Sequence, residues 1–151
     1  MNRIVISEQH KAHRDALLHL VTSFDTSVAP LIGQGDRNVI KAMPFGQDIL
    51  AVKSFKSPNI INKWVYRFWR KSKAERSFYY AQRLLALNVG TAEPVGFAES
   101  YKYFGLDRSF YLSRGLKPDF TFRELIHDVN IPRRDYILEL FTAVADTHLR
   151  A

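Results

Sequence analysis

The sequence predicts an α+β fold, in which antiparallel strands and helices occupy separate stretches of the chain. Segments typical of strands come in pairs, long amphipathic segments typical of helices stand between them, and no internal repeat is present. A parallel α/β sheet would need strands and helices to alternate one by one, which they do not. The 151 residues are 46% hydrophobic and 25% charged, the composition of a globular protein with one domain, or one and part of a second.

Composition narrows the classes of function. Twenty-two basic against 15 acidic residues give a formal charge of +7, which favours an anionic partner: phosphate, nucleotide, nucleic acid or an acidic membrane face. The absence of cysteine excludes disulfides, thiolate nucleophiles, and zinc–thiolate or iron–sulfur sites. No apolar run approaches the roughly 18 residues of a spanning helix, and charges stand where a signal peptide needs an apolar stretch. We therefore expect a cytoplasmic protein.

The chain begins with a weakly alternating segment, Arg3 to Ser7, which predicts a short strand. A helix is expected from His10 to Phe24, because Leu17, Leu18 and Val21 recur at helical spacing. This helix also carries three histidines, His10, His13 and His19. They raise the alternative of a metal site, but no carboxylate or fourth ligand stands at matching spacing, so a solvated helix surface is favoured.

Two strands joined by a turn are predicted next, at residues 37–43 and 49–56. Residues 44–48 between them contain the proline, glycine and aspartate typical of a hairpin loop. Ser57 and Pro58 then begin a helix, with serine as N-cap and proline at the first helical position. The apolar and aromatic side chains of this helix are Ile60, Ile61, Trp64, Val65, Phe68 and Trp69.

A capping box begins a second helix. Ser72 and Glu75 stand three residues apart, as the N-cap and the glutamate of such a box do. The helix is expected to run to about Leu87 and to end at Asn88-Val89-Gly90. Its apolar face consists of Ala74, Phe78, Ala81 and Leu85.

Another strand pair is predicted at residues 94–100 and 108–114, around a loop at residues 103–105. Thr121 and Glu124 form a second capping box, which begins a short helix, and a last helix is expected from Pro132. Its apolar residues follow the i, i+3, i+4, i+7 rule: Ile137, Leu140, Phe141 and Val144.

Five residues around the first hairpin carry the chemistry. Gly33 and Gly35 precede the hairpin, and Ala51 and Lys53 lie on its second strand. A glycine-rich turn between strands lets backbone N–H groups approach phosphates, and a lysine on the next strand is held at a fixed distance from them. Val39 is expected to cover a purine ring, and the small Ala51 leaves room for that ring. A Gly-x-Gly alone is usually only a turn, but its place before this hairpin favours phosphate binding.

This arrangement resembles the N-lobe of protein-kinase-like folds: G-x-G-x-x-(G)-x-V, then A-x-K, a helix, two more strands and a hinge. More narrowly, it is similar to the lipopolysaccharide core kinases, the Kdo and heptose kinase family, over residues 30–151. The stretches that carry the similarity are Arg37-Asn38-Val39-Ile40-Lys41, Val52-Lys53-Ser54-Phe55-Lys56, Arg70-Lys71-Ser72-Lys73-Ala74-Glu75-Arg76-Ser77-Phe78, Gly90-Thr91-Ala92-Glu93-Pro94-Val95 and Phe120-Thr121-Phe122-Arg123-Glu124-Leu125.

The resemblance implies roles for single residues. Lys53 matches the lysine that binds the α/β-phosphates of ATP, and Gly33 and Gly35 match the phosphate loop, in which Asn38 replaces the third glycine. The last strand and the hinge, whose backbone would bind adenine, match Leu112, Arg114 and Leu116.

The resemblance leaves the role of Glu75 open. The family's acidic helix position falls on Ser77 or Tyr79, and Glu75 is the nearest acid. It either forms an ion pair with Lys53 or serves only in the capping box.

The resemblance also implies three parts: an N-terminal extension (residues 1–32), a kinase-like N-lobe (33–114) and the start of a truncated C-lobe (115–151). His148 resembles the histidine that precedes the family's catalytic loop, but no catalytic aspartate, metal-binding asparagine or second aspartate follows it. The ligands of Mg²⁺ would therefore lie beyond residue 151, and this polypeptide alone should not transfer phosphate.

Residues 53–76 contain eight basic residues and one acid, interleaved with Trp64, Tyr66, Phe68 and Trp69. A solvated helix face accounts for them as well as function does. The functional alternatives are an anionic membrane surface or a phosphate-rich core sugar. A nucleic acid is not expected as the partner, because no nucleic-acid fold motif is present.

The function that the resemblance implies is ATP-dependent phosphorylation of a lipid-linked core sugar, by a protein peripheral on the inner face of the inner membrane. The alternatives are a non-catalytic nucleotide-binding or interaction module and a basic nucleic-acid-binding protein. Because covering residues are absent from its apolar stripe, we also expect self-association through residues 132–151.

Overall fold

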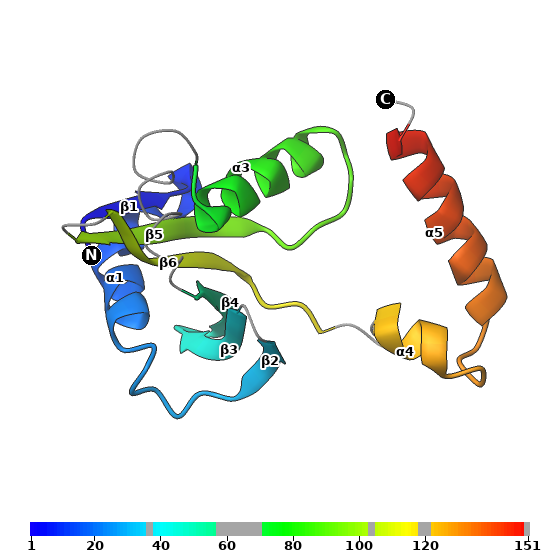
Figure 1. Ribbon diagram of the computed structural model, residues 1–151, viewed down its shortest axis with the longest axis horizontal. Coiled ribbons are helices and arrows are strands. Elements are labelled where there is room, and N and C mark those ends of the chain that lie inside the picture. The colour runs from blue at the N-terminus through cyan, green and yellow to red at the C-terminus, as the bar shows by residue number, and fades with distance from the viewer. Residues whose placement is uncertain (36–37, 57–70, 103–104, 118–121, 150–151) are drawn as a thin grey trace. The chain divides into compact units, whose positions relative to one another are not determined.

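The computed structural model describes residues 1–35, 38–56, 71–102, 105–117 and 122–149. The chain divides into two compact units, Met1–Leu116 and Lys117–Ala151. The first unit confirms the expected α+β class: it contains a six-stranded sheet in which every neighbouring pair of strands is antiparallel (Figure 1).

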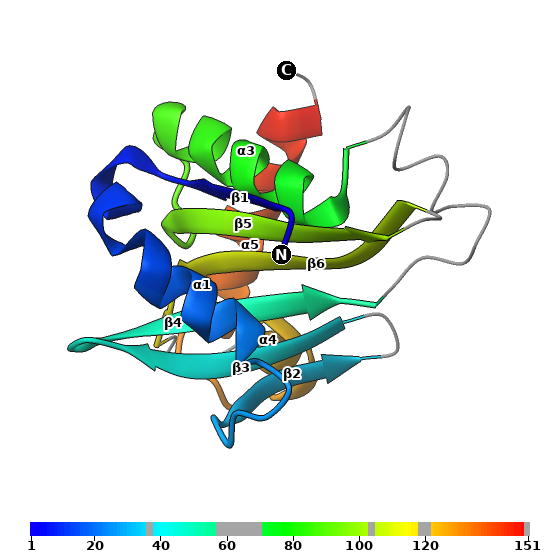
Figure 2. The same cartoon turned by 90° about the vertical axis from the view of Figure 1, so that its left-hand side faces the viewer.

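The strands follow the order β1-β5-β6-β4-β3-β2 across the sheet (Figure 2). Their bounds are β1 Arg3–Ile6, β2 Leu31–Gly35, β3 Asn38–Phe45, β4 Asp48–Phe55, β5 Pro94–Lys102 and β6 Gly105–Arg114. The helices of this unit are the 3₁₀ helix η1 (Glu8–His13), α1 (Arg14–Thr22) and α3 (Lys73–Ala86). The second unit contains α4 (Phe122–His127) and α5 (Arg134–Leu149).

Both expected strand pairs are present, and two predictions needed correction. The segment 31–35, which sequence patterns left outside the strands, is β2 and pairs with β3. The helix expected from His10 begins as the 3₁₀ helix η1, and only Arg14–Thr22 is α-helical. The helix expected after Ser57 falls outside the described residues.

Helix α1 covers one face of the sheet and completes the main core (Figure 2). Its buried side chains and Phe24 pack against residues from β3, β4, β5 and β6: Met43, Leu50, Val52, Val95, Ala98, Phe110 and Leu112. Strand β1 pairs along the edge of β5, with Arg3 opposite Glu99. The N-terminal residues expected to be an extension are therefore part of the sheet and core of the first unit.

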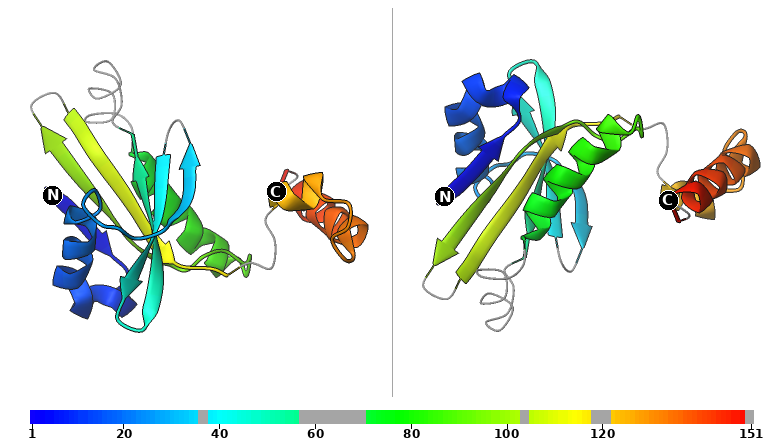
Figure 3. Two further views of the ribbon diagram at one scale, coloured as in Figure 1. Left: turned by 90° about the horizontal axis from the view of Figure 1, so that it is seen from below. Right: turned by 90° about the horizontal axis from the view of Figure 1, so that it is seen from above.

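Helix α3 packs on the opposite face, along β5 and β6 (Figure 3). Phe97 and Ala98 are neighbours on β5, so they point to opposite faces; Ala98 belongs to the α1 core, and Phe97 packs with Phe78 of α3. The four buried residues of this second cluster are Phe55, Ala74, Phe78 and Phe97. The two helices thus sandwich the sheet, and each strand residue belongs to one of two distinct faces.

The sequence signals at both ends of α3 are confirmed. The Glu75 backbone N–H donates to Ser72 Oγ at 3.0 Å, which is the first half of the expected capping box. At the other end, Asn88 has φ 57°, its N–H donates to Leu85 O, and the Val89 N–H donates to Leu84 O. These two bonds define a Schellman motif, in which asparagine takes the left-handed position usually held by glycine.

Candidate functional site

Lys53 lies on the face of the sheet that α3 occupies. Directly opposed residues of antiparallel strands point to the same face, and Lys53 opposes Ile40 of β3 and Tyr111 of β6. Tyr111 in turn opposes Phe97, which packs under α3. Helix α3 lies along β5 and β6. Lys53 on β4 is two strands away from β5, Ile40 on β3 is three strands away, and both are only half-buried.

Two of the predicted site residues share this face with Lys53. Ala51 precedes Lys53 by two residues, so both point the same way, and it opposes Ala42 of β3. Gly33 opposes Ile40 across β2 and β3. A Cβ added to Gly33 would lie 3.2 Å from the Ile40 side chain, so glycine leaves that isoleucine room to lie against the backbone of β2. A row of small residues therefore borders the lysine.

The structure places Val39 on the other face. It lies between Asn38 and Ile40 on β3, opposes Ser54, and packs against the core that α1 covers. It therefore does not share a face with Ala51 and Lys53, and the apolar position on their face is held by Ile40. The motif spacing contained this signal, because a count from Gly33 through G-x-G-x-x-G-x-V ends at residue 40.

The two glycines occupy a strand instead of the turn expected from the sequence. Both belong to β2, and Gly35 opposes Asn38 at the end of the β2–β3 pair. The connection between these strands, residues 36–37, is outside the described part of the chain. Nothing lies within 4 Å of a Cβ added to Gly35, so there is open space on that side of its backbone. Both glycines thus lie on β2, just before its connection to β3, which is the place that the resemblance assigns to phosphate.

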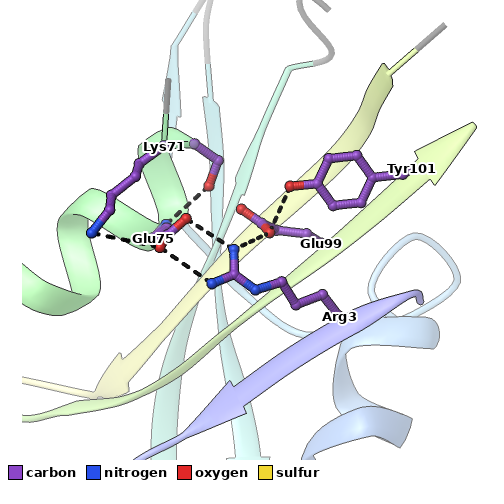
Figure 4. A network of polar contacts seen from close by, with 6 residues as sticks. Arg3, Lys71, Glu75, Glu99 and Tyr101 are labelled. Atoms are coloured by element: carbon purple, nitrogen blue, oxygen red, sulfur yellow. Dashed lines mark hydrogen bonds and ion pairs between the residues drawn. The ribbon is translucent and has the colours of Figure 1, made fainter. Parts of the chain in front are cut away.

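Glu75 is bound by Arg3, which reaches it from β1 (Figure 4). The Arg3 guanidinium donates from Nη1 to Oε2 at 2.9 Å and from Nη2 to Oε1 at 3.2 Å, and Nη1 also donates to Glu99 Oε2 at 3.0 Å. Lys71 Nζ lies 3.9 Å from Glu75 Oε1. Within the described residues, Lys53 forms no ion pair, and its Nζ lies 5.3 Å from the centroid of the Phe55 ring. Of the two roles left open for Glu75, the structure shows its place in the capping box with Ser72, and among the described residues it shows no ion pair between Glu75 and Lys53.

Arg3, Glu75, Glu99 and Tyr101 form one cluster of hydrogen-bonded polar side chains, the Arg3 cluster. The hydrogen bond to Glu75 is the main cause that raises the pKa of Arg3 above its usual value. The hydroxyl of Tyr101 donates to Glu99 Oε2 at 2.9 Å (Figure 4). Burial, together with this bond, raises the pKa of Tyr101 to about 12. Sequence patterns missed this cluster, because Arg3 and Glu75 are 72 residues apart.

Of the predicted hinge residues, Leu112 and Arg114 lie at the end of β6 and Leu116 follows the strand. Their side chains do not form one patch. Leu112 opposes Val52 and is buried in the α1 core, whereas Leu116 is exposed. Arg114 forms ion pairs with Asp48 at 3.1 Å and Glu93 at 3.4 Å. These pairs connect the end of β6 with the start of β4 and with the residue before β5. Because the Arg114 side chain is occupied in this way, the segment offers a ligand mainly its backbone groups.

A depression of about 340 Å³ lies beside the tip of the β2–β3 pair. It is lined by Phe24, Asp25, Gly35, Asn38, Val39, Ser54, Lys56 and Arg108. Asp25 and Arg108 form a two-point ion pair there, with distances of 2.6 and 2.8 Å. Phe24 and Val39 belong to the α1 side of the sheet, and Lys53 is not among the lining residues, but Gly35 and Asn38 of the predicted phosphate loop are.

Three further features predicted from sequence concern metal binding, the basic stretch 53–76 and membrane-spanning helices. In the described ranges no three His, Cys, Asp or Glu side chains gather closely enough to hold a metal ion. Most of the basic stretch 53–76 lies outside the described residues, so its membrane and core-sugar interpretations stay predictions. Among the described helices, none combines the length and the apolar character needed to cross a membrane.

No protein-family model, curated protein or solved structure matches the chain.

Proposed function

We propose that the chain is the ATP-binding part of a phosphotransferase of the lipopolysaccharide core sugar kinase type. The observation that carries this proposal is the position of Lys53: it lies on a central strand, on the same face as Gly33, Ile40 and Ala51. Helix α3 packs on that face beside it. This combination supports a kinase-like N-lobe, in which a strand lysine and a glycine hairpin hold the phosphates of a nucleotide.

The chemistry of these residues suits a nucleoside triphosphate. Lysine offers a compact positive charge to phosphate oxygens, and without a carboxylate partner among the described residues its charge is available. No atom lies within 4 Å of a Cβ added to Gly35, so an anion has room beside the backbone there. Ile40 offers an apolar surface, and the small Ala42 and Ala51 leave space beside it for a flat purine ring.

Lys53→Met should weaken ATP binding by about 10- to 100-fold, because it removes one charge-assisted contact to phosphate. Titration calorimetry on the 151-residue chain measures the effect. Lys11→Met is the control: it removes the same charge at an exposed position on η1, away from the strands that carry the proposed site. It should leave the dissociation constant within about twofold. Equal binding by wild type and Lys53→Met, or no binding by the wild type, would contradict the proposal.

We also propose that α5 mediates self-association. In this helix Leu140 is 48% exposed and Tyr136 59%, and exposed apolar side chains on one helix tend to find a partner. Light scattering should therefore give a mass above that of the monomer. Leu140→Glu should shift the mass toward the monomer, whereas Glu139→Gln, at the exposed neighbouring position, should not. A monomeric wild-type chain would exclude this surface as a contact between copies.

A further inference from the structure

The depression beside the tip of the β2–β3 pair contains more positive than negative charge. Among the described residues that line it, Arg108 and Lys56 are cations and Asp25 is the one carboxylate. Lys56 forms no ion pair with another residue in the described part of the chain. The hydrogen bond from Arg108 is the main cause that lowers the pKa of Asp25, and the nearby charge of Lys41 adds to it. The local field therefore favours an anion.

The cations of the depression and Lys53 serve opposite faces of the sheet. Phe110 opposes Ser54 across β4 and β6 and belongs to the α1 core, and Arg108 precedes Phe110 by two residues on β6. Lys53 is the neighbour of Ser54 and points to the other face, as does Asp107, the neighbour of Arg108. A single phosphate group therefore cannot contact both Arg108 and Lys53.

Arg108 presents its guanidinium to the depression as a two-point donor. Its Nη1 and Nη2 donate to the two carboxylate oxygens of Asp25 at 2.6 and 2.8 Å. A phosphate group accepts the same pair of parallel hydrogen bonds and carries more charge than a carboxylate. The side chains of Arg108 and Asp25 are 39% and 61% exposed, so this ion pair contributes little to stability and can open.

The loop that carries Asp25 is held in place without Arg108. Lys41 Nζ donates to the carbonyl oxygens of Phe24 and Ser27, each at 2.7 Å, on either side of Asp25. The Phe24 side chain is also buried in the α1 core. Opening the ion pair would therefore leave the loop where it is and release a guanidinium into the depression.

We propose that the depression binds a phosphomonoester, whose phosphate displaces the Asp25 carboxylate from Arg108 and also contacts Lys56. The volume of about 340 Å³ lies at the lower end of the range for small-molecule sites, which suits a compact ligand such as a sugar phosphate. The Ser54 hydroxyl and the Asn38 amide, both in the lining, are groups that bind sugar hydroxyls. This site is additional to the ATP site proposed above and does not depend on it.

Titration calorimetry of the full chain with glucose 6-phosphate tests this site, with an expected dissociation constant of about 1 mM. Arg108→Gln should weaken binding by about tenfold and Lys56→Met by about threefold, because each removes a charge-assisted contact to phosphate. Asp25→Asn removes the competing carboxylate and should strengthen binding by about threefold or more. Lys53→Met, on the other face, and Lys11→Met, on η1, should leave the affinity within about twofold.

A phosphomonoester is also the headgroup of phosphatidic acid, and sedimentation with vesicles separates this source from a soluble one. Arg108→Gln and Lys11→Met each remove one positive charge, so a general attraction to vesicles of phosphatidic acid and phosphatidylcholine weakens equally in both. We expect this equal weakening together with glucose 6-phosphate binding, which supports a soluble ligand. A loss of vesicle binding confined to Arg108→Gln would support the same site with a lipid headgroup in it.

The expected opposite signs for the two partners of one ion pair decide the outcome. A purely structural pair predicts that Arg108→Gln and Asp25→Asn change the affinity in the same direction, since both break the same contact, and that result would overturn the proposal. A wild type that binds neither glucose 6-phosphate nor the vesicles through Arg108 would overturn it too, as would a tenfold loss in Lys53→Met, which would assign the phosphate to the ATP site. If Arg108→Gln does not fold, unchanged affinity in Lys56→Met and Asp25→Asn is the overturning result.

Discussion

Replacing Phe24 by alanine should lower the free energy of unfolding of the first unit by about 3–5 kcal/mol. Phe24 is 3% exposed and meets the Phe110 ring at 5.4 Å between centroids. The Lys41 ammonium lies 5.0 Å from its ring centroid and also donates to the Phe24 carbonyl oxygen at 2.7 Å. The truncation therefore leaves a cavity between α1 and the sheet and removes a cation–π contact.

Urea denaturation followed by circular dichroism measures this loss, with Val28→Ala as the control. Val28 is fully exposed four residues further on, so its truncation should change the free energy of unfolding by less than about 0.5 kcal/mol. If Phe24→Ala costs as little as Val28→Ala, then α1 does not complete the core, and residues 1–32 are a separate extension after all.

Local signals predicted much of the fold from sequence. The Ser72 cap and the Asn88 terminus of α3 depend on a few adjacent residues, so their patterns translate directly into hydrogen bonds. The turn between β3 and β4 is likewise local, with Gly46 at φ 59°. In each case the atoms that interact lie within six positions of one another.

Non-local contacts explain what the sequence patterns missed. The sequence predicts a turn where β2 lies, because two of its five residues are glycine, and only its pairing with β3 makes it a strand. The sequence also predicts Val39 at the site, whereas the strand pairing places Ile40 on the face of Lys53. The face of a strand residue depends on which neighbour it opposes, and the spacing along the chain does not show that neighbour. The partner of Glu75 comes from the N-terminal strand β1, and nothing near Arg3 in the sequence indicates a carboxylate 72 positions away.

Replacing Arg3 by methionine should lower the free energy of unfolding by about 3 kcal/mol, the lower end of the range for breaking a buried ion pair. The cost arises mainly from the carboxylates, because Glu99 is 0% exposed and Glu75 7%, and both lose their strongest donor. The value belongs at the lower end since the Arg3 side chain is 41% exposed, which lets water replace part of the guanidinium.

A double-mutant cycle distinguishes this charge effect from lost packing. Arg3 also lies over the Phe97 ring, 5.0 Å from its centroid, so part of the cost persists whatever stands at residue 75. Glu75→Gln removes one of the two carboxylates that Arg3 binds, so Arg3→Met should cost at least about 1 kcal/mol less in that background. Lys11→Met, which breaks an exposed ion pair with Glu8, should cost less than about 1 kcal/mol. Additive effects of Arg3→Met and Glu75→Gln would mean that Arg3 stabilises the first unit through its contacts with Glu99 and Phe97 and not through Glu75.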